Sequence, residues 1–388
     1  MAADEPLARL RYVAEDAPTG YGDAADRLVN ALRGAGTRVE YRGWSNTRGG
    51  AAPALVPFSR DTVPTEVAPV GRPTVVHLVP EYYPLVREVV DGMGPFVAHT
   101  VWETDRIPAH WPDLINLADR VVVPTAWNRD VFAEGGVTIP IDVVPHVACD
   151  PVPGDGGASL GIDDDEFVVY SIGRWDQRKA MFHTVRAFLE AFDGDDPVVL
   201  VVKSGPRIEM PPVDEWGTTN PMAWTTGWQI AHIVSQYVNP AHVRLEVGTW
   251  TDAQIAGLHT RGDCYLSLPR GEGWGIGAFD AAAYGNPVVA SGWGGLADFL
   301  DPEVSSLVRG ALVPVEHHAF ASYSPDQRWL EPDIHHAAEL LRGVYGDHAR
   351  AVSRAREFSA QVLQKFSPAV VASSFLDVLQ RSEADVTP

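Results

Sequence analysis

The clearest indication of the fold is the stretch Phe167-Val168-Val169-Tyr170-Ser171-Ile172, which runs directly into Gly173. It is a short, continuous apolar run rich in β-branched residues, and a longer helical pattern follows it. Similar runs occupy residues 74–79, 120–123, 198–202 and 287–290. Continuous apolar strands that alternate with helices are typical of parallel sheets covered on both faces. We therefore predict an α/β fold built on doubly wound parallel sheets.

The length of 388 residues predicts two domains, each large enough for its own core. A Pro- and Gly-rich stretch without apolar period, near residues 148–165, is typical of a linker. We place the domains at residues 1–150 and 151–370, and a helical pattern continues into residues 371–388. Residues 205–225, rich in Pro, Gly, Trp and Thr, resemble a long insertion, either a binding loop or a disordered one.

The charge balance excludes several classes of partner. The chain carries 51 acidic and 30 basic residues, a formal net charge of -21. Such a field repels nucleic acid and anionic lipid. The first residues lack a signal-peptide pattern, and no run of about 18 apolar residues predicts an integral membrane segment. With only Cys149 and Cys264, the sequence favours a soluble protein in the reducing cytoplasm.

The most informative motif is a glycine-rich loop between a strand and a helix. The predicted strand 264–268 leads into Pro269-Arg270-Gly271-Glu272-Gly273-Trp274-Gly275-Ile276-Gly277, and Gly285 and Pro287 close the following helix. Free N–H groups at a helix start attract anions, so Gly273, Trp274, Gly275 and Ile276 are candidate contacts for a diphosphate. The spacing matches neither the P-loop nor the dinucleotide motif, and a tight structural turn is the alternative.

Two carboxylates make this segment specific. Glu272 lies in the loop and Asp280 lies eight residues further on, and both accept hydrogen bonds from sugar hydroxyls. The segment resembles the E-x7-E motif of the retaining family 4 glycosyltransferases, with Asp280 in place of the second Glu. The resemblance implies the GT-B fold, two Rossmann-like domains facing a central cleft. It also implies that Glu272 binds the donor sugar and Asp280 the ribose.

A second match follows the strand at residues 167–172. The sequence Gly173-Arg174-Trp175-Asp176-Gln177-Arg178-Lys179 resembles the G-R-x-D-x-x-K-G element of that family, with Ala180 in place of the last Gly. The resemblance implies that Arg174 and Lys179 hold the donor diphosphate. We interpret Arg178 as a solvated charge on a helix face. Lys203, after the strand 198–202, is either a third cation for the diphosphate or a surface lysine.

The first half of the chain carries weaker matches in the same order as the family. Gly20, Tyr21 and Gly22 resemble its N-terminal glycine loop, and His99 ends a predicted strand where members carry a histidine that contacts the donor sugar. A lone His is often structural, but ligand groups collect at such strand ends. The candidate acceptor contacts are Tyr21, Trp102 and Glu103. In the second half of the chain, Trp250 lies where the family has its base-contacting loop, so the resemblance implies a donor contact there.

Together these matches imply a retaining, metal-independent hexosyltransferase that uses a nucleotide-diphosphate sugar and no cofactor. The first domain would hold the acceptor and the second the donor, with the last helix packing back on the first domain. Residues 1–147 carry 13 Arg, no Lys and 19 acidic residues, a net of -6, which favours a soluble saccharide or small natural product as acceptor. The alternatives are a non-catalytic sugar-nucleotide or glycan-binding module and a GT-B epimerase or phosphorylase.

Overall fold

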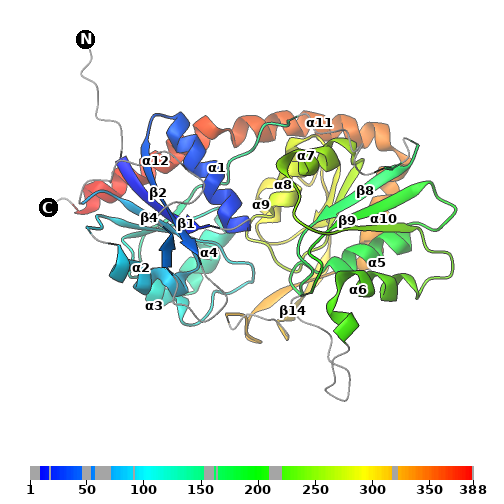
Figure 1. Cartoon of the computed structure of the whole chain (residues 1–388), viewed down its shortest axis with the longest axis horizontal. Helices are drawn as coiled ribbons and strands as arrows, with labels where there is room; N and C mark the ends of the chain where they lie inside the picture. Colours follow the sequence, from blue (N-terminus) through cyan, green and yellow to red (C-terminus); the bar gives the residue numbers. More distant parts are fainter. Residues whose placement is uncertain are drawn as a thin grey trace, which may run out of the picture. The chain divides into compact units, whose positions relative to one another are not determined.

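The chain forms two compact units in a computed structural model (Figure 1). The first unit comprises residues 1–102, 106–149 and 364–388, and the second comprises residues 103–105 and 150–363. The structure describes residues 9–16, 19–45, 54–56, 71–90, 92–152, 161–162, 165–208, 221–316 and 322–386. Residues 153–160 and 163–164 of the predicted linker and 209–220 of the predicted insertion lie outside these ranges.

The first unit contains a seven-stranded sheet in the order β3-β2-β1-β4-β5-β6-β7. Its strands are β1 (Arg9–Glu15), β2 (Arg38–Ser45), β3 (Ala54–Val56), β4 (Thr74–His77), β5 (Phe96–His99), β6 (Arg120–Val123) and β7 (Ile141–Val143). All neighbouring strands are parallel except β2 and β3. The helices are α1 (Gly20–Gly34), η1 (Pro80–Tyr82), α2 (Tyr83–Val89), α3 (Trp111–Ile115), α4 (Ala126–Glu134) and α12 (Pro368–Val386).

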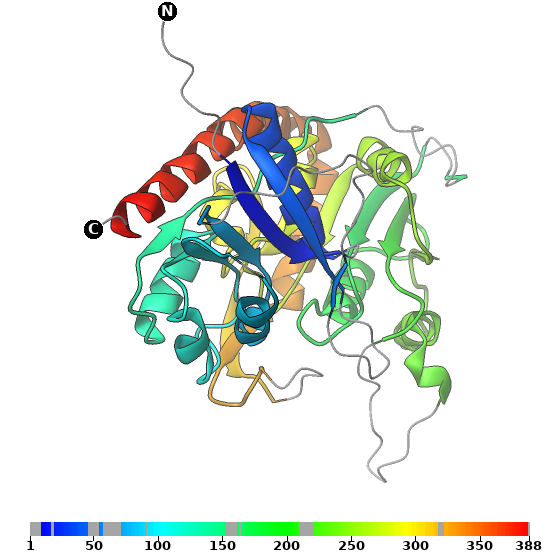
Figure 2. The same ribbon diagram turned by 60° about the vertical axis from the view of Figure 1, so that its left-hand side comes forward.

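The core of the first unit joins the beginning and the end of the chain. The strand residue Tyr12 and the helix residue Phe375 are both buried in one apolar cluster, and their rings lie 6.5 Å apart. Helix α12 packs against α1, and the two lie side by side in Figures 1 and 2. The chain passes into this unit at Gln364, within α11 (His348–Lys365) and earlier than the predicted residue 371.

The second unit contains a six-stranded sheet in the order β10-β9-β8-β11-β12-β13, with all neighbours parallel. The strands are β8 (Phe167–Ile172), β9 (Val198–Lys203), β10 (His242–Glu246), β11 (Cys264–Ser267), β12 (Val288–Ser291) and β13 (Ser306–Val308). An antiparallel pair follows, β14 (Gly310–Pro314) and β15 (Arg328–Pro332). The remaining helices are α5 (Met181–Ala191), η3 (Pro221–Trp224), α6 (Thr226–Val234), α7 (Asp252–Arg261), α8 (Ile276–Ala283), α9 (Leu296–Phe299) and α10 (Ile334–Gly346).

Both sheets reverse their strand order in the middle, between β1 and β4 and between β8 and β11. The predicted α/β class with doubly wound parallel sheets is confirmed. The apolar run 167–172 forms β8, whose central residues Val168, Val169 and Tyr170 are fully buried. Ligands of such sheets bind beyond the carboxyl ends of the strands where the order reverses. This places the loops after β8 and β11 at the ligand-binding position of the second unit.

Candidate active site

The two motifs of the second half meet beside each other in the fold. Strands β8 and β11 are hydrogen-bonded neighbours, with Val169 opposite Cys264 and Tyr170 opposite Tyr265. The segment 173–180 follows β8, and the glycine-rich loop follows β11. Lys179 and Glu272 come from these two segments, and their side chains form an ion pair. The structure therefore joins, at the predicted position in the sheet, residues that lie 93 positions apart in the sequence.

A tight turn holds Lys179 in place. The carboxylate of Asp176 accepts a hydrogen bond from the Lys179 backbone N–H at 2.6 Å, and the Asp176 carbonyl accepts one from Ala180 at 3.0 Å. Ala180 adopts φ 46° and ψ 42°, the only positive φ among the described non-glycine residues. This left-handed conformation costs an L-residue about 1–2 kcal/mol. It gives a physical reason for the glycine that is usual at this position in the family.

Glu272 is the centre of a buried ion cluster. Its Oε1 accepts a hydrogen bond from Lys179 Nζ, and its Oε2 lies 3.3 Å from Arg178 Nη1. The residue is only 8% exposed. Burial alone would raise the pKa of Glu272, but the charges of Lys179 and Arg178 outweigh it and hold the pKa below its usual value. Glu272 is therefore a charged acceptor at neutral pH.

The interpretation of Arg178 as a solvated charge is wrong. Its guanidinium is buried, donates a hydrogen bond to the Gly271 carbonyl at 2.9 Å, and lies 3.7 Å from a Glu103 carboxylate oxygen. The other oxygen of Glu103 accepts a hydrogen bond from Tyr323 at 2.9 Å. Arg178, Lys179, Glu272, Glu103 and Tyr323 are called the Glu272 cluster below. All five belong to the second unit.

Two predicted acceptor contacts have other roles in the structure. Glu103 was expected to bind an acceptor in the first domain, but residues 103–105 group with the second unit and its carboxylate faces Tyr323 and Arg178. Trp102 is 3% exposed, donates its indole N–H to the Arg106 carbonyl at 2.7 Å, and packs on Trp111. Trp102 is a core residue because its ring and its polar atom are both used internally.

Close packing accounts for two glycines of the loop. A Cβ on Gly271 would lie 1.9 Å from the Glu103 carbonyl oxygen. Gly275 has φ 92° and caps α8, and a Cβ there would lie 2.5 Å from Leu296. The structural-turn reading therefore holds for these positions. Trp274, predicted to contact the donor, is 4% exposed and packs on Phe279 and Phe299.

The remaining donor candidates lie on more accessible surface. The side chain of Arg174 is 52% exposed and lies 3.6 Å from Asp176, and Asp280 is half-buried on α8. Ile276 begins α8, next to Gly273 and Gly275 in the loop. The half-buried Trp250 has Lys203 over its ring at 5.3 Å, and Lys203 donates a hydrogen bond to the Gly248 carbonyl at 2.7 Å. Lys203 thus contacts two residues of the loop that is predicted to bind the base, Gly248 and Trp250.

Neighbouring groups are used in a second ion network. Arg270 pairs with Glu331 of β15 at 2.6 Å rather than with Glu272, and His183 lies 2.7 Å from the same carboxylate. The Leu330 N–H donates to the Arg270 carbonyl at 2.8 Å. This network fixes β15 to Arg270, which directly precedes Gly271 in the glycine-rich loop. Tyr323 and Glu331 could not be predicted, because nothing in the local sequence shows that residues after β14 return to this loop.

The first unit holds a neutral polar cluster at its strand ends. His77 ends β4 and His99 ends β5, and their rings stack with centroids 3.8 Å apart. The Tyr12 hydroxyl lies 2.9 Å from His77 Nδ1 and 3.2 Å from His99 Nδ1. Among the described residues, His99 Nε2 has no hydrogen-bond partner. Burial holds the pKa of both imidazoles well below the usual value, and repulsion from His146 adds to this.

The other candidates of the first unit surround the start of α1. Gly20 is the first residue of α1, and the Gly22 N–H donates to the Thr19 side chain at 3.2 Å. The Tyr21 hydroxyl lies 2.9 Å from Thr100 Oγ1, one residue after His99. Its ring centroid lies 5.3 Å from that of His77. The glycine loop and the predicted histidine are therefore brought together within one unit.

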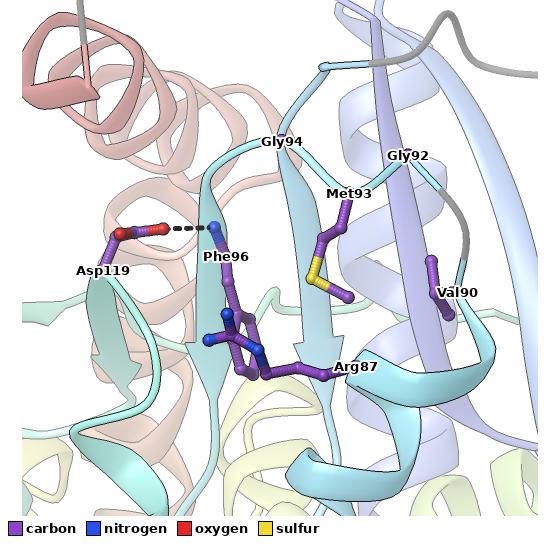
Figure 3. A pocket seen from close by; sticks show the side chains of 7 residues that line it. All are labelled: Arg87, Val90, Gly92, Met93, Gly94, Phe96 and Asp119. Atoms are coloured by element: carbon purple, nitrogen blue, oxygen red, sulfur yellow. Dashed lines mark hydrogen bonds between the residues drawn. The ribbon is translucent and has the colours of Figure 1, made fainter.

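A pocket in the first unit lies away from these residues. It has a volume of about 430 Å³ and is lined by Arg87, Val90, Gly92, Met93, Gly94, Phe96 and Asp119 (Figure 3). Phe96 begins β5 and Asp119 precedes β6, so the pocket lies at the opposite edge of the sheet from His99. The Asp119 carboxylate accepts the Phe96 N–H at 2.6 Å. In the described part of the chain, no group of three or more metal-binding side chains is found.

Comparison with known proteins finds a family match for part of the sequence and solved structures with a similar fold. Residues 222–375, which include Glu272 and Asp280, match the family described as family 4 glycosyltransferase in conflict systems. No curated protein sequence matches the chain.

The structure resembles solved proteins over nearly its whole length. Sucrose-phosphate synthase from Thermosynechococcus elongatus is 16% identical with a TM-score of 0.68, over 97% of this chain and 100% of that one. For α,α-trehalose 6-phosphate synthase from Burkholderia multivorans the identity is 15% and the TM-score 0.68, over 98% and 100%. For Anabaena HepE, solved with UDP-glucose, the values are 12% and 0.66, over 96% and 99%. The chain therefore has the GT-B fold over nearly its whole length, and its residues 222–375 match the family 4 glycosyltransferase model.

Proposed function

We propose that the protein is a retaining glycosyltransferase that moves a hexose from a nucleotide-diphosphate sugar to a hydroxyl of a soluble acceptor. The observation that carries this proposal is the Glu272 cluster beside the reversal point between β8 and β11. It combines a buried, charged acceptor of hydrogen bonds with a partly exposed ammonium group. A sugar diphosphate needs both, because its hydroxyls donate hydrogen bonds and its phosphates carry negative charge.

The proposed roles follow from the chemistry of each side chain. Glu272 accepts hydrogen bonds from hydroxyls of the donor sugar, and Asp280 from the ribose. Lys179 and Arg174, helped by the free N–H groups at the start of α8, neutralise the diphosphate as it leaves. These cations take the place of a metal ion in the proposal. His99 contacts the donor sugar, and Tyr21 an acceptor.

The proposed reaction takes place on one face of the sugar. The acceptor hydroxyl forms a bond to the anomeric carbon while the bond from that carbon to the diphosphate oxygen breaks. The proton of the hydroxyl passes to the leaving diphosphate oxygen, so no enzyme nucleophile is needed and configuration is retained. The enzyme contributes orientation and electrostatic stabilisation of the leaving group.

The proposed acceptor is a saccharide or small natural product, and the proposed location is the cytoplasm. The acidic balance of residues 1–147 supports the soluble acceptor, since anionic membranes attract basic surfaces, and the presence of only two cysteines supports the reducing cytoplasm. Within the described residues, one helical stretch, His348–Ala384, is long and apolar enough to span a membrane. Its second half is α12, which buries Phe375 and Val371 in the core of the first unit. This supports a role in packing for that stretch.

A binding panel tests the donor site. UDP, GDP, ADP, CMP and dTDP, free and with attached sugars, are added to the protein and its thermal unfolding is measured. UDP is the first choice, because Anabaena HepE was solved with UDP-glucose. A ligand at about 100 times its dissociation constant stabilises the protein by about 2.7 kcal/mol. One nucleotide should raise the melting temperature, and Lys179→Ala should abolish the shift.

The outcomes separate the alternatives. No shift with any nucleotide overturns the donor site. A shift without any transfer of sugar to saccharide acceptors favours the non-catalytic binding module instead. Turnover that requires inorganic phosphate identifies a phosphorylase. The anomeric configuration of the transferred or released sugar tests retention directly. It should be the same as the configuration of that sugar in the donor.

A further inference from the structure

Each oxygen of Glu272 contacts a different cation, and the two cations are held differently. Oε1 contacts Lys179 Nζ, and Oε2 lies 3.3 Å from Arg178 Nη1. The Lys179 side chain is 26% exposed, whereas that of Arg178 is 7% exposed. An ammonium on a flexible stem can turn towards another anion, whereas a guanidinium binds through a rigid fork. The two contacts are therefore not equivalent when a second anion arrives.

Several contacts fix Arg178. Its Nη1 donates to the carbonyl of Gly271, the residue before Glu272, at 2.9 Å. Its Nη2 lies 3.7 Å from Glu103, whose carboxylate also accepts the Tyr323 hydroxyl. Its own carbonyl accepts the Arg270 N–H at 2.7 Å. If the guanidinium moved, the buried carboxylate of Glu272 and the partly buried one of Glu103 would lose a counter-charge, which makes this movement costly.

A sugar diphosphate makes opposite demands on the two partners of the ion pair. Its phosphates attract Lys179, and its hydroxyls need the Glu272 oxygens as acceptors. When Lys179 turns to the phosphates, its positive charge is shared between them and Glu272. The burial of the Glu272 carboxylate is then less well compensated. A buried carboxylate without a cation takes up a proton and then accepts fewer hydrogen bonds. Arg178 is the cation that stays in place.

We propose that Arg178 is a positioning residue that holds Glu272 charged and oriented for the sugar of the donor, while Lys179 serves the diphosphate. This inference rests on the donor site proposed above and adds a division of labour to it. Arg178 fixes both the Glu272 carboxylate and the Gly271 carbonyl beside it. Its removal therefore affects recognition of the sugar and leaves recognition of the nucleotide diphosphate in place.

Calorimetric titration of Arg178→Met with UDP and with UDP-glucose tests this division. The measured quantity is the ratio of the two dissociation constants, UDP over UDP-glucose. Removing a charged hydrogen-bonding partner should lower this ratio about 10- to 100-fold relative to the wild type, with the UDP constant changed by less than about 3-fold. Arg178→Lys should recover part of the ratio, because it restores the charge but not the fork. Lys179→Met should weaken both ligands together.

Arg270→Met is the matched control. Arg270 precedes Glu272 in the same loop and also forms an ion pair, but that pair is more exposed and its partner is Glu331 rather than Glu272. The ratio should stay at the wild-type value in this variant even if its melting temperature falls. If Arg178→Met weakens UDP and UDP-glucose equally, Arg178 is only structural and the inference is overturned. If the wild type binds no nucleotide of the panel, the proposed function itself fails. Should Arg178→Met not fold, the ratio for Arg178→Lys decides, and an unchanged ratio overturns the inference.

Discussion

The two units bury polar groups at the carboxyl ends of their sheets in opposite ways. In the second unit, the Glu272 cluster contains four full charges, of Arg178, Lys179, Glu272 and Glu103, which compensate one another. In the first unit, His77 and His99 share the single hydroxyl of Tyr12, and burial keeps both imidazoles neutral. A charge needs a partner before it can be buried, whereas a neutral imidazole needs only one hydrogen bond. The comparison predicts that substitutions and pH affect the two sites differently.

The largest expected effect comes from breaking the charged site. Lys179→Ala removes the partly exposed cation that is proposed to bind the diphosphate, and it leaves Glu272 with one cation fewer. Loss of such a group typically costs about 10²–10³ in turnover. We expect this decrease in the rate at which UDP is released from UDP-glucose.

Lys365→Ala is its control, since Lys365 lies 5.0 Å over the Phe366 ring and outside the Glu272 cluster. Circular dichroism checks that both variants fold. Equal rates for Lys179→Ala and the wild type would contradict the role of the charged site.

A smaller effect separates the two sites by pH. His77 and His99 have folded pKa values below the unfolded one, so the unfolded chain binds protons first as pH falls. Their contribution is fully present above about pH 6.5 and is lost below it, by about 1.4 kcal/mol per pH unit for each imidazole. Glu272 also has a lowered pKa, but a carboxylate loses its contribution only at more acidic pH, below about 4.5.

Urea unfolding at pH 7.5 and 5.5 measures this difference. The wild type should lose stability between the two pH values, and the double variant His77→Gln, His99→Gln should lose clearly less. His183 of the second unit is less buried and also has a lowered pKa. The loss of stability between the two pH values is therefore measured for His183→Gln as well, as a comparison. A loss as large in the double variant as in the wild type would mean that the imidazole pair is not the acid-sensitive element.

The smallest effect sharpens the account of the turn that presents Lys179. Ala180→Gly relieves about 1–2 kcal/mol of left-handed strain, which offsets roughly 1 kcal/mol for the lost methyl group and the more flexible unfolded chain. We expect a change within about 0.5 kcal/mol, or a gain, in the free energy of unfolding.

Ala187→Gly is the matched substitution, because Ala187 is equally buried but lies inside α5. It should lower the free energy of unfolding by about 1 kcal/mol or more. If both variants lose the same amount, the positive φ of Ala180 carries no strain.

The sequence predicted those parts of the site that each lie in a short local motif. Lys179 and Glu272 were both placed after strands, and parallel strands align their carboxyl ends, so their meeting follows from the pattern of strands and glycines. His99 was placed at the end of β5 for the same reason. One error concerns burial, because Arg178 is predicted in solvent but is buried. The predicted acceptor contacts of Trp102 and Glu103 stay predictions, although both side chains have partners within the protein. Exposure depends on segments that the local sequence does not reveal.

The parallel strands, their alternation with helices, and the charged residues after β8 and β11 can all be derived from the amino-acid sequence alone. Apolar runs and glycines act locally, so these features can be recognised without the fold. Three features become visible only in the folded chain: Arg178 is buried between Glu103 and Glu272, Tyr323 completes the cluster, and Tyr12 links two imidazoles. The physical reason is that a buried polar group is stable only with its partners, and here those partners come from distant parts of the chain.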